Sequence, residues 1–184
     1  MGDYYDIDDI LAEEDFVPVQ FLKAVNGVKI DESSERGFVE QDSKAELPFW
    51  LARGLHLQQA ISIKVPACFN RNTRLEIEAD AGSVDLRSRC SYFYEFGCKV
   101  APFCDKSIGL LVSYTFKARY KEVLYKAHTK AFAAASKVMN FLTKEETNLY
   151  EAAQSSMAAF RKWRMGGPRL QRASILGRKR KPPE

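Results

Sequence analysis

Residues 105–128, DKSIGLLVSYTFKARYKEVLYKAH, decide the fold class of the second half of this chain. Apolar side chains recur there at intervals of three and four residues, which is the spacing of one face of an α-helix. Leu110, Tyr114 and Tyr125 lie off that face. Because a helix that is apolar on more than one face is buried on more than one side, we expect this helix to pack in a bundle. The residues of its main apolar face are Ile108, Leu111, Val112, Phe116, Tyr120, Val123 and Ala127.

The last helix has the clearest beginning in the sequence. Thr143 and Glu146 have the spacing of a capping box, in which each side chain accepts a hydrogen bond from the other residue's backbone N–H. The apolar seam that follows steps by four and three residues. It consists of Leu149, Ala153, Ser156, Phe160 and Trp163. The same periodicity predicts further helices over residues 67–80, 84–100 and 130–142.

The first third of the chain has the period of β-strands. Val17, Val19 and Phe21 alternate with other residues, and Pro18 favours an edge strand or the start of a strand. Asn26-Gly27 is the sequence of a tight hairpin turn, AISIKV at 60–65 predicts another strand, and Pro48 opens a short helix. The predicted fold is therefore mainly α with a small β-rich part. It divides into an acidic β-rich domain (1–65), a helical-bundle domain (66–167) and a basic disordered tail (168–184).

The composition of the 184 residues excludes several classes of protein. With 46% apolar and 28% charged residues, the chain can bury a core and is neither collagen-like nor a disordered tail. Charge is distributed unevenly, with a balance of −9 over residues 1–48 and of +8 over residues 161–184. An acidic head and a basic tail indicate contacts with other macromolecules.

No motif for catalysis, for a metal or for a cofactor is present in the sequence, so we predict a protein without any of the three. The best enzyme candidates are Asp6, Asp8 and Asp9, which could hold Mg²⁺ for phosphoryl chemistry. The alternative is that these carboxylates form a solvated face or a docking segment. The four cysteines form no CxxC pair, and the two histidines stand apart from each other.

Two basic segments leave nucleic-acid binding open. Lys117, Arg119, Lys121 and Lys126 lie near Tyr114 and Tyr120, a combination that can bind nucleic acid or form the charged outer face of a helix. The second segment fits a nuclear localisation signal or weak DNA contact. It consists of Arg178, Lys179, Arg180 and Lys181.

An aromatic run interrupts the predicted helix 84–100. Tyr92, Phe93, Tyr94 and Phe96 fall within five residues. Since successive residues of a helix turn by ~100°, we expect that these rings do not all face one core. Some of them should meet a partner or lie under the small domain.

Four blocks of the sequence resemble the family of GINS complex subunits of the Psf-three type. These blocks match in order and spacing, and the resemblance covers about residues 4–167. The second block, at 44–55, is the most specific. The blocks are YDIDDIL (5–11), KAELPFWLARGL (44–55), VDL (84–86) and FYEFG (93–97).

The resemblance implies a nuclear, non-catalytic scaffold subunit of a heterotetramer with no cofactor. Each subunit of this family has a helical A domain and a small β-rich B domain, and in this type the B domain comes first. The tetramer joins the Cdc-forty-five protein and the Mcm hexamer in the replicative helicase, for initiation and for fork progression. The alternative, read from the residues, is an autonomous DNA-binding module that uses the basic helix and tail.

The resemblance also assigns roles to residues. Asp6, Asp8 and Asp9 would be free to dock on the helicase ring or line the central hole. The residues that pack the two domains together would be Leu47, Pro48, Trp50 and Leu51. The candidates for subunit interfaces would be Tyr92, Phe93, Tyr94, Phe96, Leu110, Tyr114, Tyr125, Phe160 and Trp163.

Overall fold

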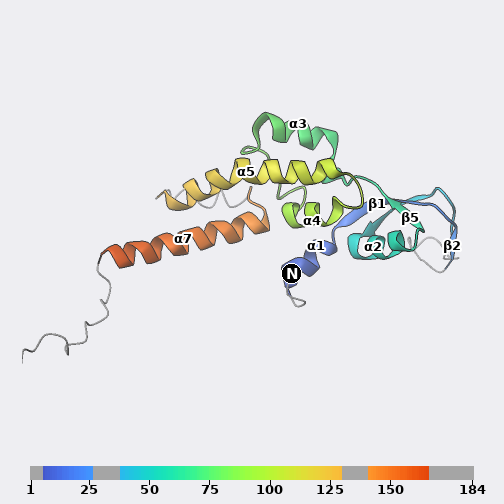
Figure 1. Cartoon of the computed structure of the whole chain (residues 1–184), viewed down its shortest axis with the longest axis horizontal. Coiled ribbons are helices and arrows are strands. Elements are labelled where there is room, and N and C mark those ends of the chain that lie inside the picture. The colour runs from blue at the N-terminus through green and yellow to red at the C-terminus, as the bar shows by residue number, and fades with distance from the viewer. Residues whose placement is uncertain (1–5, 27–37, 130–140, 166–184) are drawn as a thin grey trace, which may run out of the picture.

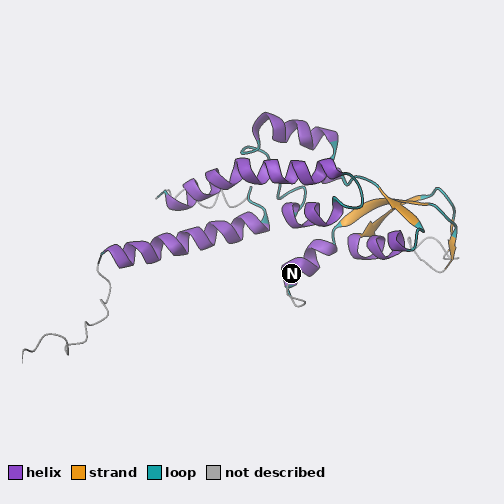
Figure 2. Ribbon diagram, viewed as in Figure 1, coloured by secondary structure: helices purple, strands orange, loops and turns teal. Residues whose placement is uncertain are grey.

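A computed structural model of the chain describes residues 6–26, 38–129 and 141–165. It has a small sheet at one end and helices along the rest of its length (Figures 1 and 2), which confirms the predicted fold class. In chain order the elements are α1 (Ile7–Glu13), β1 (Phe16–Phe21), β2 (Val25–Asn26), β3 (Phe38–Val39), β4 (Lys44–Pro48), α2 (Phe49–Leu57), β5 (Ile61–Ile63), the 3₁₀ helix η1 (Ala67–Phe69), α3 (Arg71–Asp80), α4 (Phe93–Val100), α5 (Lys106–His128) and α7 (Lys144–Arg164).

The main sheet is antiparallel, with strand order β4-β1-β5. Val17, Val19 and Phe21 of β1 point into the core, as their alternation predicts. Of the two positions that Pro18 suggested, the edge strand is wrong, because β1 is the central strand, but Pro18 does lie near the start of β1. Pro18 lies just past the register with β5, where its carbonyl accepts the Lys64 N–H at 2.8 Å. The proline has no N–H to donate in return, and the Lys64 carbonyl accepts the Cys104 thiol at 3.4 Å instead.

The hairpin predicted at Asn26-Gly27 falls mostly outside the described residues. Its described half is β2, which pairs with β3 in the register Val25 to Val39 and Asn26 to Phe38. The strand partner of β2 therefore comes from a later part of the chain than the adjacent residues 28–30.

Helix α2 carries the connection between the sheet and the helices. Leu47 and Phe49 are buried, and the Phe49 ring makes edge contacts with Phe96 of α4 at 6.1 Å and with Phe103 at 5.8 Å. Pro48 and Leu51 are half-buried. Trp50 is 54% exposed, so its predicted role in packing the two parts together is wrong. Sequence reasoning placed that role one residue too late, because successive helix residues point about 100° apart.

The predicted helix over 84–100 is also too long. Only Phe93–Val100 forms α4, and residues 84–92 form turns. Asp85 accepts the Ser88 N–H at 3.1 Å, and the Ser88 hydroxyl donates to the Asp85 carbonyl at 3.2 Å. Such local bonds between polar side chains and the backbone compete with helix formation. The helix predicted at 67–80 is likewise divided, into η1 and α3, by the N-cap Asn70.

Helix α4 lies at the centre of the molecule (Figure 1), and one continuous core runs from the sheet to α5. Phe69 of η1 packs on Phe93 at 4.9 Å and on Phe96 at 6.0 Å between ring centroids. At Gly97 the helices approach closely, since a Cβ there would lie 2.5 Å from Val112 of α5. The two halves of the chain are thus joined by aromatic packing around α4.

The neighbouring residues Phe49 and Trp50 give a direct test of this packing. We expect Phe49→Ala to lower the free energy of unfolding by about 3–5 kcal/mol, since it removes a buried ring from between α2 and α4. Trp50→Ala, the matched control, should change it by less than about 1 kcal/mol. Urea denaturation of both variants measures the difference, and equal losses would contradict the assignment.

Candidate protein–protein interface

The buried face of α5 differs from the predicted stripe along its middle. Ile108, Leu111 and Val112 are buried as predicted, but the next buried positions are Thr115 and Arg119. Phe116 and Tyr120, which the periodicity placed on this face, are partly exposed. Thr115 and Arg119 have the spacing of the buried face of α5. Hydrophobic periodicity did not predict their burial, because both side chains are polar.

Arg119 and Glu146 form a buried ion pair between α5 and the start of α7. The guanidinium Nε donates to Glu146 Oε1 at 2.6 Å and Nη2 donates to Oε2 at 2.9 Å. The remaining donors reach the backbone carbonyls of Ala81 at 2.7 Å, Val84 at 2.8 Å and Phe141 at 3.2 Å. Both side chains are only 3–4% exposed, so every donor of the pair needs a partner.

Two other hydrogen bonds connect Glu146 to its surroundings. Oε2 accepts the Thr143 N–H at 3.2 Å, which completes the predicted capping box, and Oε1 accepts the Tyr94 hydroxyl at 2.5 Å. Burial and the Glu146 carboxylate raise the pKa of Tyr94, so its hydroxyl remains a donor. Burial alone would lower the pKa of Arg119, but the hydrogen bonds to Glu146 outweigh it and raise the pKa.

This network fixes α5 and α7 side by side, running in the same direction (Figure 1). Beyond it, Tyr150 and Ala153 of α7 pack with Val123 and Ala127 of α5 in a second apolar cluster. Helix α7 then continues past the end of α5 at His128. The two helices are therefore packed together along α5, and the C-terminal end of α7 projects beyond α5.

Large apolar side chains are exposed on helices α5 and α7. The most exposed on α5 are Leu110 (74% exposed), Tyr114 (51%) and Tyr125 (70%), and on α7 they are Phe160 (51%) and Trp163 (75%). The rings of Phe160 and Trp163 lie 5.7 Å apart. We call these five residues the α5–α7 surface. Exposed apolar groups in this number are typical of surfaces that bind another protein.

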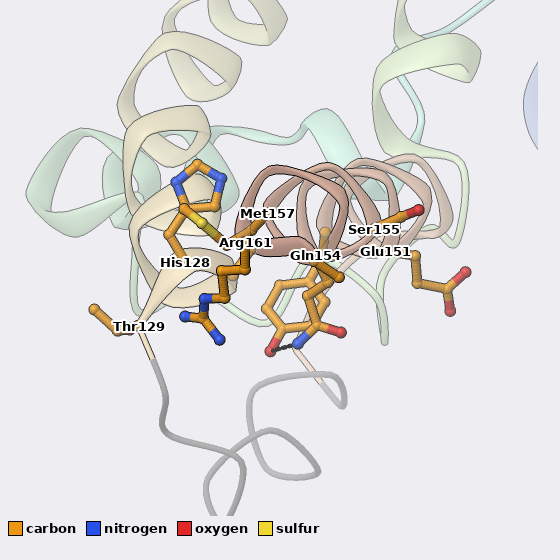
Figure 3. Close-up of a pocket in the computed structure, with 10 residues that line it drawn as sticks. His128, Thr129, Glu151, Gln154, Ser155, Met157 and Arg161 are labelled. Atoms are coloured by element: carbon orange, nitrogen blue, oxygen red, sulfur yellow. Dashed lines mark hydrogen bonds between the residues drawn. The ribbon is translucent and has the colours of Figure 1, made fainter. Parts of the chain in front are cut away.

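A groove of about 350 Å³ lies where α7 passes the end of α5 (Figure 3). His128 and Thr129 line it from α5, and Met157 and Arg161 line it from α7. Within it the Gln154 amide donates to the Tyr150 hydroxyl at 3.0 Å. The described lining mixes apolar side chains with polar ones, among them Thr129, Glu151 and Ser155.

Three of the predicted interface residues belong to the chain's own core. Phe93, Tyr94 and Phe96 are buried, because α4 is enclosed by η1, α5 and α2 and can therefore bury rings on several sides. Their assignment to a subunit interface is therefore wrong. The alternative, that some of these rings lie under the small domain, agrees with the contact of Phe96 with Phe49 of α2. Tyr92 is half-buried and donates its hydroxyl to Asp8 of α1 at 3.0 Å.

The acidic segment at the N-terminus is attached to α4, contrary to the prediction that it would be free. Asp6 caps α1, while Asp8 accepts hydrogen bonds from Tyr92 and from Asn148. Asp9 forms an ion pair with Lys99 of α4 at 2.5 Å. The carboxylates of Asp8 and Asp9 therefore make contacts within the chain.

Burial beside this contact perturbs two further carboxyl groups. Burial and a hydrogen bond to Asp9 raise the pKa of Glu95 to about 7. Burial also raises the pKa of Glu145, although the backbone N–H groups of Tyr94 and Glu95 donate to it at 3.1 Å. The hydrogen bond from Lys99 lowers the pKa of Asp9. Because these groups lie at the contact between α1 and α4, we expect this contact to depend on pH.

The predicted localisation signal and the predicted absence of a metal site concern the last positions singled out from the sequence. Arg178, Lys179, Arg180 and Lys181 lie outside the described residues. Over residues 6–26, 38–129 and 141–165, no three metal-ligating side chains gather in one place. In the same ranges no helix combines the length and the apolar character needed to cross a membrane.

Comparison with known proteins identifies the class. The GINS complex protein helical bundle domain matches residues 68–165, which is more than half of the chain, and the PSF3 N-terminal domain matches residues 5–57. These matches place the chain among the helical-bundle proteins of the GINS class.

Two relatives identify the family within this class. A protein of Phaeosphaeria nodorum named DNA replication complex GINS protein PSF3 is 31% identical over 172 residues, covering 89% of this chain and 96% of the relative. The human protein of the same name is 28% identical, covering 89% of this chain and 81% of the relative. The chain belongs to the PSF3 family.

Removal of Arg119 tests the buried network. We expect Arg119→Met to lower the free energy of unfolding by about 3–5 kcal/mol, because it leaves Glu146 buried without its cation. Lys117→Met, on the exposed side of the same helix, is the matched control and should change little. Denaturant titration measures both, and a stable Arg119→Met protein would show that the ion pair is dispensable.

The pH dependence tests the contact between α1 and α4. The folded-state pKa of Glu95 is raised, so the folded protein binds its proton more tightly than the unfolded chain. The contribution of this group to stability is therefore lost as the pH rises from about 4.5 to about 7. Thermal unfolding from pH 5 to pH 8 should show a decline in the unmodified protein that is smaller in Glu95→Gln. Parallel curves would contradict the assignment.

Proposed function

We propose that this chain is a non-catalytic scaffold subunit of the heterotetrameric GINS complex in DNA replication. Through that complex it joins the Cdc-forty-five protein and the Mcm hexamer in the replicative helicase, in the nucleus. The observation that supports this most directly is the α5–α7 surface, where five large apolar side chains are exposed on helices held rigidly together. The match to the GINS helical bundle and the names of the relatives support the same proposal.

The sister subunits would bind on the α5–α7 surface. Aromatic side chains such as Tyr114 and Trp163 supply large contact areas at protein interfaces. Helix α7 continues past the end of α5. On it Phe160 is 51% exposed and Trp163 is 75% exposed, so both offer apolar area that a partner would cover. The half-buried Tyr92 is a secondary candidate.

We also propose the division into a small domain over residues 1–65 and a helical domain over 66–167. Leu47, Pro48 and Leu51 would help to pack them, with Phe49 in the role first given to Trp50. The bounds of the two family matches, 5–57 and 68–165, support a boundary near residue 65.

The contacts of the described residues favour this proposal over a DNA-binding module. Arg119 is buried in the network with Glu146, and Lys126 pairs with Glu122 at 2.5 Å. Only Lys117 and Lys121 of the basic interval remain for phosphate contacts in the described helix. The residues 178–181 are proposed as a localisation signal. An enzyme based on Asp8 and Asp9 is disfavoured because Tyr92 and Lys99 already engage these carboxylates.

Assembly of the complex with Trp163→Asp tests the scaffold role. Light scattering on the chain coexpressed with the other three GINS subunits should show a particle containing one copy of each. Trp163→Asp should weaken assembly by at least about tenfold, because the interface would then bury an unpaired charge. Since Trp163 is exposed in this chain alone, the variant should still fold.

Leu57→Asp is the matched control, since Leu57 on α2 is equally exposed and lies away from the α5–α7 surface. It should assemble normally. Normal assembly of Trp163→Asp would remove α7 from the interface, and an unmodified chain that ignores the other subunits would overturn the scaffold role.

A further inference from the structure

Helix α1 is attached with its polar side inward. Asp8, Asp9 and Glu13 face α4, where Lys99 contacts Asp9 and Glu13, and Ala12 is the one residue of α1 that is buried. The opposite side of the helix exposes Ile7 (70%), Ile10 (51%) and Leu11 (41%). An amphipathic surface helix normally has the reverse orientation, with the apolar stripe on the core.

The inward contacts prevent α1 from turning over. Besides the two ion pairs, Lys99 donates to the Asp9 carbonyl at 2.9 Å, and Tyr92 donates to Asp8 at 3.0 Å. At the end of the helix, Glu13 lies 3.8 Å from Arg53 of α2. Rotation of the helix would leave Lys99, which is 19% exposed, without its carboxylates. The aliphatic stripe is therefore held outward by the fold.

The charge around the stripe indicates what can bind there. Exposed carboxylates lie at both of its ends, Asp6 at the N-cap and Glu14 at the C-cap. No lysine or arginine occurs between residues 6 and 22. A ligand of this face thus needs aliphatic side chains for the stripe and basic side chains for its rim, which is the composition of a basic amphipathic helix.

The face is separate from the α5–α7 surface. Helix α4 lies between α1 and α5 (Figure 1), and both α1 and α5 contact α4. Helix α7 contacts α1 near its own start, where Asn148 donates to Asp8, and Phe160 and Trp163 lie about three to four turns further along α7. A partner that covers Phe160 and Trp163 can therefore leave the outer side of α1 open.

We propose that the outer face of α1, formed by Ile7, Ile10 and Leu11, docks a basic amphipathic helix of a protein outside the four-subunit assembly. This goes beyond the scaffold role, because it gives the chain a contact for a protein that is not a sister subunit.

A labelled peptide of alternating leucine and lysine heptads tests this proposal. Fluorescence anisotropy would measure its binding to the assembled four-subunit complex, and the same titration on the purified chain alone applies whether or not the complex forms. Substituting Ile7→Gln and Ile10→Gln together should raise the Kd by at least about tenfold, since two aliphatic contacts are lost. These substitutions leave the charge and the inward contacts unchanged. Leu75→Gln on α3, which is also half exposed, is the matched control and should bind normally.

Three results would overturn the proposal. Equal binding by the doubly substituted chain would mean that the peptide binds by charge alone or elsewhere. Equal binding of a leucine–glutamate peptide would show that basic charge is irrelevant. Loss of peptide binding when the chain enters the complex would mean that a sister subunit covers α1. Failure of the scaffold role appears separately, as the absence of the four-subunit particle.

Discussion

The ion pair of Arg119 and Glu146 is the contact on which the helical part depends. A guanidinium that is 4% exposed must have every donor satisfied, and its acceptors come from three places in the chain: the Ala81–Val84 turn, Phe141 and Glu146 of α7. Tyr94 adds α4 to the network, because its hydroxyl donates to Glu146. Because such a pair tolerates little displacement, it sets the position of α7 along α5. The outward side chains of both helices are fixed as a consequence.

Two exposed apolar surfaces follow from buried polar contacts. The network around Glu146 holds α5 and α7 so that Tyr114, Tyr125 and Trp163 face solvent in this chain. In the same way, Lys99 holds α1 so that Ile10 faces outward. In both places charged side chains that sequence patterns assign to a solvated surface pack against the rest of the chain, and apolar side chains are exposed. This arrangement suits a member of the PSF3 family, whose relatives are named as proteins of a complex.

Sequence patterns predicted the long elements well. The periodicity of residues 105–128 and the capping box at Thr143 matched α5 and α7, because each depends on neighbours within one helix. Sequence patterns failed where the residue that packs on a side chain, or donates a hydrogen bond to its neighbourhood, comes from a distant segment of the chain. Pro18 occupies a central strand, at a point just past the register with β5 where the Cys104 thiol donates to the Lys64 carbonyl, and Phe49 rather than Trp50 packs on α4.

The sequence by itself determined the class of fold, the order of strands before helices, and the family resemblance, all of which depend on local spacing and short blocks. The tertiary structure alone decided which apolar residues are available for binding. Phe93 and Phe96 are enclosed while Leu110 and Trp163 are not, and nothing in their local sequence distinguishes them. The reason is physical: burial depends on which other segments of the chain surround a side chain, and that arrangement is set by contacts such as Arg119 with Glu146 across 27 residues.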